Sequence, residues 1–363
     1  MEPVYMDTGA TVRPHKEVVD VATKYMSELW HNPSALYSSA AKVKTQMENS
    51  RKVVADFINA KPEEIYFTSG STESNNWVIR GFDDMTHGKK ATIYTTPIEH
   101  KSILKAVQNP CLHSQVEYIS VDEYGLVDLD ALDKQLKLKK STFLVSVMAA
   151  NNEVGSINKL YRIGEIVHKH GGIFHTDATQ LLPHYKMNVK QLGIDLLSGS
   201  GHKFGSFKGT GFLYIKDGIN LSPLIDGEQE SGYRGGTENF LGIIAMAKAI
   251  EILEIDMEER AVLMNMKRNK LIKGLQDLGC KLNGVYQHRL PNNVNVILPP
   301  NVNAESMVLM LDMSGCQCST GSACNSKLVE PSHVLRSMGL SDDEANRSIR
   351  FTISEDTTEE QID

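Results

Sequence analysis

Between residues 61 and 214, short apolar runs alternate with helical segments, and this alternation restricts the possible folds more than any other feature. The run EIYFTSGSTESNNWVIRGF combines an apolar strand, a Gly/Ser turn and an amphipathic helix. The segment TFLVSVM at 142–148 is apolar and rich in β-branched residues, which is typical of a strand buried on both faces. Short strands separated by helices indicate a mostly parallel sheet with helical crossovers. The sequence therefore predicts an α/β fold.

The pattern changes after Glu238, where one long helical segment is expected to run to about Leu278. A strand at NVNVILP, an amphipathic helix at AESMVLMLDM and a strand at SIRFTIS follow it. A further helix is expected at 15–29, near the start of the chain. The segments after Glu238 predict a smaller α+β domain beside the sheet of the large domain.

These elements divide the chain into two expected domains. The large α/β domain covers 14–240, and the small α+β domain combines 1–13 with 241–363. The final residues, TTEEQID, resemble the first turn of a helix, so the sequence leaves open whether the natural chain continues past Asp363.

The charge of the chain argues against one class of partner. With 38 Lys and Arg against 45 Asp and Glu, the net charge is −7 at pH 7. No long basic run is present, whereas sequence-independent nucleic-acid binding needs clustered positive charge. We therefore expect no direct nucleic-acid partner.

Neither secretion nor membrane insertion is expected. The N-terminal MEPVYMDTGATVRP lacks the basic and apolar regions of a signal peptide. The most apolar helical stretch, FLGIIAMAKAIEIL, contains Lys248 and Glu251 and is shorter than the roughly 20 apolar residues that span a bilayer. Five cysteines are an odd number and do not suggest a disulfide framework. We expect a cytoplasmic protein with reduced thiols.

Polar residues follow several predicted strands, where the ligands of parallel sheets bind. Lys203 lies in SGSGHKFGSFKG, a Gly-rich loop that also contains Ser200 and His202. A lysine there could form a Schiff base with an aldehyde cofactor, and a solvated surface lysine is the alternative. Asp177 ends GGIFHTD, where it could hold a cationic ring nitrogen or simply cap a helix.

Two further motifs point to a cofactor. In FTSGSTES, Ser71 and Thr72 follow Gly70 at a strand-to-helix junction, where free N–H groups and the helix dipole can hold a phosphate. His100 in PIEHKSIL could stack on a flat ring or move a proton, although a structural histidine is the alternative. Along the chain, the candidate phosphate turn is followed by His100, then Asp177 and then Lys203. This order is that of the type I pyridoxal phosphate-dependent transferase fold.

Common metal and nucleotide motifs are absent from the sequence. There is no HExxH, no paired CxxC and no EF-hand loop, and Cys316 and Cys318 are too close for the usual zinc knuckle. The P-loop order GxxxxGK[ST] and a GxGxxG after the first strand are also missing. We expect no bound metal.

With these residues in view, the chain resembles the class V aminotransferase family, and within it the cysteine desulfurases that supply sulfur for iron–sulfur clusters and related pathways. The resemblance runs through nearly the whole chain. It is carried by DTGAT, NPSALY, FTSGSTES, IEHKSIL, NNEVGSI, HTDATQ, SGHKFGSFKGTG, YRGGTEN, STGSACNS, EPSHVLRSMG and SIRF.

The resemblance implies a role for each matching residue. Lys203 would bond the cofactor, pyridoxal 5'-phosphate, and later move the substrate Cα proton. Asp177 would pair with the ring nitrogen, Gln180 would approach the ring hydroxyl, and His100 would stack on the ring. The implied phosphate ligands are Ser71, Thr72, Ser200 and His202, with Thr237 reaching in from a second subunit. The implied substrate-carboxylate ligands are Asn152 and Arg350, whose guanidinium matches a carboxylate.

The resemblance also separates the three clustered cysteines. It implies that Cys324 is the nucleophile, which attacks the sulfur of the bound cysteine. Cys316 and Cys318 stand where the family usually has apolar residues, and on a strand they would face the same side. We expect both to be core residues. A sulfur relay through them is the alternative.

Three departures from the family pattern concern the rim of the site and the choice of partner. Asp226 replaces a usual glycine, Ser354-Glu355 replaces a Gly-Arg pair, and Tyr37 stands where a histidine is usual.

The resemblance implies an L-cysteine desulfurase, a homodimeric enzyme that converts cysteine to alanine and passes persulfide sulfur to an acceptor protein. That acceptor would be a cluster scaffold or a tRNA-thiolation factor. A selenocysteine lyase, or another class V lyase or aminotransferase, is the alternative. A non-catalytic, cysteine-based sulfur carrier or cluster-binding protein is the remote alternative.

Overall fold

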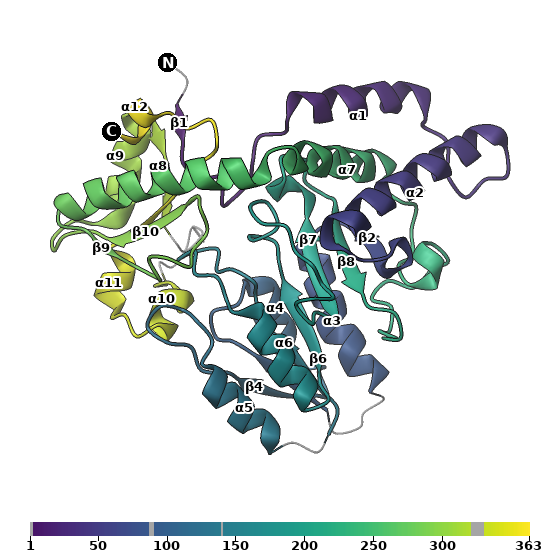
Figure 1. Ribbon diagram of the computed structural model, residues 1–363, viewed down its shortest axis with the longest axis horizontal. Coiled ribbons are helices and arrows are strands. Elements are labelled where there is room, and N and C mark those ends of the chain that lie inside the picture. Colours follow the sequence, from purple (N-terminus) through teal and green to yellow (C-terminus); the bar gives the residue numbers. More distant parts are fainter. Residues whose placement is uncertain (1–2, 87–90, 139–140, 321–329) are drawn as a thin grey trace.

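A seven-stranded sheet forms the centre of the larger part of the molecule (Figure 1). The computed structural model describes residues 3–86, 91–138, 141–320 and 330–363. The strand order is β2-β8-β7-β6-β5-β3-β4, and only β8 runs antiparallel to its neighbours among the described strands. The strands are β2 (Ile65–Thr68), β3 (Thr92–Thr95), β4 (Gln115–Tyr118), β5 (Phe143–Ser146), β6 (Ile173–Asp177), β7 (Leu196–Ser200) and β8 (Gly211–Ile215). The predicted mostly parallel sheet is confirmed.

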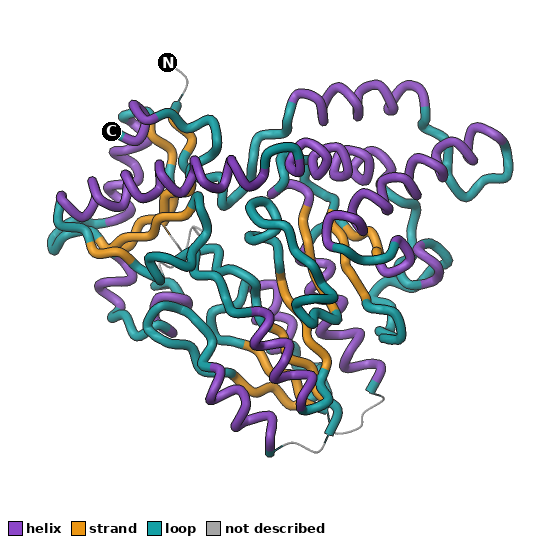
Figure 2. The backbone as a smooth tube through the Cα atoms, in the orientation of Figure 1, coloured by secondary structure: helices purple, strands orange, loops and turns teal. Residues whose placement is uncertain are grey.

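Helices cover both faces of this sheet (Figure 2). Successive strand residues face opposite sides. Val145 and Leu197 accordingly pack in one buried apolar cluster, and their neighbours Leu144 and Leu196 pack in another. The helices on the first side are α1 (Lys16–Glu28), α2 (Ser38–Ile58), α5 (Leu129–Lys137), α6 (Leu160–Lys169) and α7 (Phe240–Glu254). Those on the second side are α3 (Ser71–Met85) and α4 (Lys101–Val107). The continuous apolar runs in the strands follow from this two-sided burial.

A smaller α+β unit lies beside the large sheet. Its sheet has the order β12-β13-β10-β9, and β1 pairs in parallel with β11 next to it. The strands are β1 (Val4–Tyr5), β9 (Lys281–Leu282), β10 (Asn293–Ile297), β11 (Cys316–Gln317), β12 (Ser319–Thr320) and β13 (Ser348–Thr352). The helices are α8 (Met257–Asp277), α9 (Ala304–Met313), α10 (His333–Ser337), α11 (Asp342–Asn346) and α12 (Glu359–Ile362). Both chain ends therefore meet in this unit, as Figure 1 shows.

The prediction of one long helix from Glu238 to Leu278 is wrong, because the chain breaks at Asp256, where φ is −145°. Before the break, α7 is buried against the core of the large sheet. After it, Leu271 and Ile272 of α8 pack in the core of the smaller unit. Because the two helices pack against different cores, their axes differ. The break is not visible in the sequence, since apolar residues keep helical spacing on both sides of it. The expected division at residue 240 stays a prediction.

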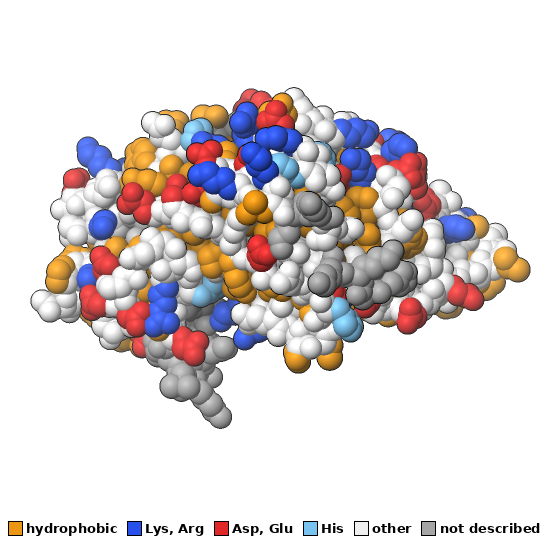
Figure 3. Space-filling view, turned by 90° about the horizontal axis from the view of Figure 1, so that it is seen from below, with side chains coloured by type: hydrophobic (Ala, Val, Ile, Leu, Met, Phe, Trp, Pro, Cys, Tyr) orange, Lys and Arg blue, Asp and Glu red, His pale blue; other side chains and the backbone are white. Residues whose placement is uncertain are grey.

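Charges of both signs are interspersed on the face shown in Figure 3. In the part of the chain that the structure describes, no helix is both long and apolar enough to cross a bilayer.

A buried ion pair fixes the loop after β8 to the sheet. Glu230 adopts a left-handed φ of 48°, and Ser231 follows with 59°, a region that costs energy for side chains other than glycine. The Glu230 carboxylate accepts hydrogen bonds from Arg51 at 2.7 and 2.8 Å and from the backbone N–H of Phe67 at 2.9 Å. Only 11% of the Arg51 side chain and 2% of the Glu230 side chain are exposed. The ion pair therefore holds the loop in a conformation that its backbone alone disfavours.

Replacing Glu230 by Gln should lower the free energy of unfolding by about 3 kcal/mol, because the Arg51 charge loses its buried partner and keeps only the half-exposed Glu48. The measurement is urea denaturation. As the matched control, Asp56→Asn breaks the Lys52–Asp56 pair, whose side chains are 65% and 60% exposed, and should cost less than about 1 kcal/mol. Equal losses in the two variants would contradict this account.

Candidate active site

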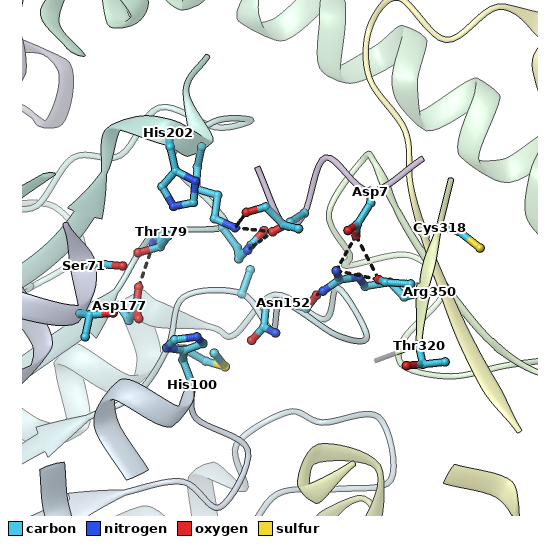
Figure 4. Close-up of a pocket in the computed structure, with 18 of the residues that line it drawn as sticks. Asp7, Ser71, His100, Asn152, Asp177, Thr179, His202, Cys318, Thr320 and Arg350 are labelled. Atoms are coloured by element: carbon cyan, nitrogen blue, oxygen red, sulfur yellow. Dashed lines mark hydrogen bonds and ion pairs between the residues drawn. The ribbon is translucent and has the colours of Figure 1, made fainter. Parts of the chain in front are cut away.

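A cavity of about 730 Å³ lies where the carboxyl ends of the large sheet meet the smaller unit. This volume is in the range of small-molecule sites. Figure 4 shows its central side chains. The residues that line it are Asp7, Gly9, Ala10, Ser71, Thr72, His100, Met148, Ala150, Asn152, Asp177, Thr179, Gln180, His202, Lys203, Glu305, Val308, Leu309, Cys318, Ser319, Thr320 and Arg350. Most of the residues predicted from the sequence are thus brought to one place.

The turn before α3 presents an open helix N-terminus to this cavity. Gly70 precedes the helix with a φ of 147°, and no side chain caps the first turn. Ser71 and Thr72 occupy that turn and line the cavity. Backbone N–H groups at a helix start, together with two hydroxyls, suit a phosphate.

Asp177, at the end of β6, is the buried acid of the site. Its carboxylate accepts from the Asn75 side chain at 2.7 Å and from the Thr179 backbone N–H at 3.0 Å. The same Asn75 amide nitrogen also lies 2.8 Å from the Ser102 hydroxyl, which in turn lies 2.8 Å from His100 Nδ1. A continuous hydrogen-bonded chain therefore joins Asp177 to His100.

His100 caps the N-terminus of α4. Its Nδ1 accepts from the Ser102 backbone N–H at 3.2 Å, so the proton of a neutral ring lies on Nε2. Burial lowers the pKa of His100 and outweighs the nearby Asp177 charge, which raises it, while the Lys203 charge adds to the lowering. A neutral, fixed imidazole is the form suited to lie against a flat ring.

Lys203 ends the short 3₁₀ turn Gly201–Lys203, which directly follows β7. Its Nζ donates to the carbonyl oxygens of Gly9 and Ala10 from the N-terminal segment. Burial lowers the pKa of Lys203 to about 8, and the positive Arg350 acts in the same direction. An amine that loses its proton near neutral pH can act as a nucleophile.

Arg350 projects from β13 into the other side of the cavity (Figure 4). Its Nη1 donates to the carbonyl oxygen of Asn152 at 2.9 Å. Its Nη2 lies 2.7 Å from Asp7 Oδ1 and 2.9 Å from the Ser319 hydroxyl. Arg350 is 7% exposed, so its guanidinium is a nearly buried positive charge that neighbouring groups hold in place.

Two of the predicted phosphate ligands behave differently from each other. His202 lines the cavity and hydrogen-bonds Thr11 at 3.2 Å, and burial lowers its pKa to about 4. Ser200 is buried at the end of β7 and does not line the cavity. Its hydroxyl lies close to Gly70, in the turn before α3.

The remaining predicted residues divide into two groups. Gln180 lines the cavity and donates to the Gly9 carbonyl oxygen at 3.0 Å. Thr237 lies on the loop before α7 and does not line this chain's own cavity. Cys324 lies outside the described residues.

The two neighbouring cysteines are half-buried at the edge of an apolar core. Cys316 and Cys318 pack against the apolar core of the smaller unit, but Cys318 also lines the cavity. Both cysteines therefore pack on the same core, as predicted, but neither is fully buried, because they lie in or between the short strands β11 and β12 beside the cavity. Burial raises the pKa of Cys318 to about 12. Its thiol is therefore protonated at neutral pH and a poor relay.

Sequence reasoning missed three contributors. Asp7, Gly9 and Asn75 contact Arg350, Lys203 and Asp177, respectively. Asp7 and Gly9 belong to the quoted motif DTGAT, but nothing in that motif alone indicates their contacts. Asn75 had a usable signal, since it is four residues after Ser71 and shares its helix face.

Comparison with known proteins agrees with this geometry. The family model for class V aminotransferases matches residues 4–363, and the chain belongs to this family. A cysteine desulfurase IscS of Methanosarcina thermophila is 42% identical and aligns with 99% of this chain and 89% of its own. A solved NifS-like protein is 35% identical with a TM-score of 0.92, covering 99% of this chain and 96% of its own. A structure of SspA in complex with cysteine is 30% identical, with a TM-score of 0.84 and coverages of 97% and 99%.

The amine of Lys203 should titrate about two units below a surface lysine, whose pKa is about 10.4. Reductive methylation of the cofactor-free protein at pH 7 to 10, read by peptide mass spectrometry, measures this difference. Lys52, 65% exposed, is the internal control in the same digest. Identical pH profiles for the two lysines would contradict the assignment.

Proposed function

We propose that this chain is an L-cysteine desulfurase that uses pyridoxal 5'-phosphate and leaves the sulfur as a persulfide on Cys324. One observation carries the proposal. Three charged or titratable groups line one cavity: the amine of Lys203, whose pKa is lowered, the buried carboxylate of Asp177 and the nearly buried guanidinium of Arg350. They match the aldehyde and ring nitrogen of the cofactor and the carboxylate of an amino acid. The family and the relatives named above support the same reaction.

The residues of the cavity fit this cofactor. Class V aminotransferases and cysteine desulfurases depend on pyridoxal phosphate in general. The uncapped start of α3, with Ser71 and Thr72, would hold the phosphate, and His202 would donate to it. When bound, the cofactor supplies an aldehyde for amines and a ring that takes up electrons.

The polar residues around the ring have matching roles. Asp177, held by Asn75, would pair with the ring nitrogen, while His100 would lie against the ring and Gln180 near its hydroxyl. Ser200, buried close to Gly70, would support the turn that holds the phosphate.

Substrate would bind on the other side of the cavity. Arg350 and Asn152 would hold the carboxylate of cysteine, which orients the Cα–H bond toward Lys203. With a pKa near 8, the Lys203 amine can take that proton and return it. The released alanine keeps the substrate's carboxylate and amine.

The described residues that flank Cys324 in the sequence lie at or close to the site. Before it, Ser319 hydrogen-bonds Arg350. After it, the Ser332 hydroxyl donates to the buried Glu153, and His333 Nε2 lies 3.0 Å from the Glu99 carbonyl oxygen. Thr320 lines the cavity, and Glu153 and Glu99 are the sequence neighbours of the cavity-lining Asn152 and His100. The described residues on either side of Cys324 therefore lie at or near the cavity, which supports its thiolate as the nucleophile.

We also propose a cytoplasmic homodimer that transfers sulfur to an acceptor protein, such as an iron–sulfur scaffold or a tRNA-thiolation factor. The corner between α1 and α2 exposes large apolar side chains: Trp30 is 73%, Leu36 105% and Tyr37 53% exposed. Clustered apolar exposure of this kind marks protein interfaces. A second copy of the chain would cover it and receive Thr237.

Cys324→Ala should lower the rate of sulfide release from L-cysteine, measured with a reductant present, at least 100-fold. The variant should keep its cofactor, so the holoenzyme should stay yellow. Alanine formation measures the same loss. Cys111→Ala, at an exposed cysteine outside the cavity, is the matched control and should keep full activity. A Cys324→Ala enzyme with normal turnover would rule out this nucleophile.

Mixed dimers test the position of Thr237. If Thr237 serves the other subunit, a dimer of one Lys203→Ala and one Thr237→Ala protomer contains one fully intact site. Co-purified through two tags, it should recover about half of the wild-type activity per dimer, at wild-type cofactor affinity. If both defects fall in separate sites, no intact site forms and the recovery is absent.

A further inference from the structure

The carboxylate-binding arginine already has a carboxylate partner within the protein. Arg350 Nη2 lies 2.7 Å from Asp7 Oδ1, and both side chains line the cavity (Figure 4). The Arg350 side chain is 8% exposed and that of Asp7 is 22% exposed, so the pair is largely shielded from solvent but reachable from the cavity. A guanidinium in such a place binds one carboxylate strongly.

Ser319 is the third member of this group. Its hydroxyl donates to Asp7 Oδ1 at 3.0 Å and accepts from Arg350 Nη2 at 2.9 Å. The backbone sets the arrangement. Ser319 stands opposite Arg350 in the β12–β13 register, and Asp7 forms a bridge with Thr352 of β13. The three side chains are therefore held together by neighbouring strands.

We propose that Asp7 is an internal competitor of the substrate carboxylate for Arg350. Asp7 pairs with Arg350 in the substrate-free enzyme, yields the guanidinium to the carboxylate of cysteine, and takes it back as alanine leaves. The proposal rests on the function proposed above, because it assumes that Arg350 binds the amino-acid carboxylate.

Two physical effects make the exchange selective and reversible. Two carboxylates beside one guanidinium repel each other, so an incoming carboxylate weakens the Asp7 contact. Ser319 continues to donate to Asp7, so the displaced carboxylate keeps a hydrogen-bond partner and the exchange avoids the cost of an unsatisfied group. Asp7 therefore weakens the binding of substrate and product alike, and it speeds the departure of alanine.

The sign of one measurement separates this role from a purely structural one. If Asp7 only held Arg350 in place, removing its charge would weaken carboxylate binding. If Asp7 competes, removing its charge strengthens that binding, provided that the fold is kept.

The test is the variant Asp7→Asn in the holoenzyme. We expect the Kd of L-alanine, followed by the absorption spectrum of the holoenzyme, and the KM of L-cysteine both to fall at least threefold. Release of alanine, measured by stopped flow, should slow by a similar factor. An unchanged or raised Kd would overturn the proposal.

A second variant keeps the proposal testable if Asp7→Asn does not fold. Ser319→Ala removes the donor that supports the displaced Asp7, so the Kd of L-alanine should rise at least threefold, and Ser319→Thr should restore it. An unchanged Kd in Ser319→Ala would count against the exchange. Ser306→Ala, on the exposed side of α9, is the matched control and should leave the Kd unchanged.

Arg350→Ala distinguishes the two levels of inference. It should weaken L-alanine binding at least tenfold. If it does not, the proposed function has assigned the carboxylate site to the wrong residue. If it does, while Asp7→Asn leaves the Kd unchanged, only the role of Asp7 is wrong.

Discussion

The balance of charge inside one largely buried cavity is the constraint on which the site depends. Lys203 and Arg350 both face the cavity, and two cations in such a place repel each other. Two acids offset this repulsion: Asp177 faces the cavity from the large sheet, and Asp7 pairs with Arg350. The pKa of Lys203 falls only to about 8, since both acids act against burial and the Arg350 charge. The lysine is thus reactive yet still compatible with the folded core.

The candidate site residues of the large sheet share one kind of position in the topology. Asp177 and Lys203 directly end or follow strands, while Ser71 and His100 lie at the starts of helices that follow strands. In a parallel sheet these positions meet at one edge. Residues from Ser71 to Lys203, more than a hundred positions apart, are therefore brought to one cavity by the sheet topology.

This shared position explains which parts could be predicted. The alternating pattern indicated the sheet, and the motifs at strand ends indicated most of the cavity. Contacts between distant backbone segments were not accessible, because nothing in DTGAT shows that Gly9 meets Lys203 or that Asp7 meets Arg350. The break at Asp256 was missed because helical periodicity continues on both sides of it. The packing of Cys316 and Cys318 on one core was predicted, but the partial exposure of Cys318 to the cavity was not, because the sequence does not show where the cavity lies.

The pairing of the first strand with the last part of the chain has a consequence for biosynthesis. Val4 pairs with Cys316, and Asp7 bridges to Thr352. These pairings bring Asp7 and Arg350, more than three hundred positions apart, to the same cavity. During translation the large sheet can fold as soon as its strands have emerged, since domains fold as units. The bridge that holds Asp7 beside Arg350 cannot form until Thr352 has left the ribosome. The turn at Ser71 can therefore form during synthesis well before Arg350 has its partner Asp7 in place.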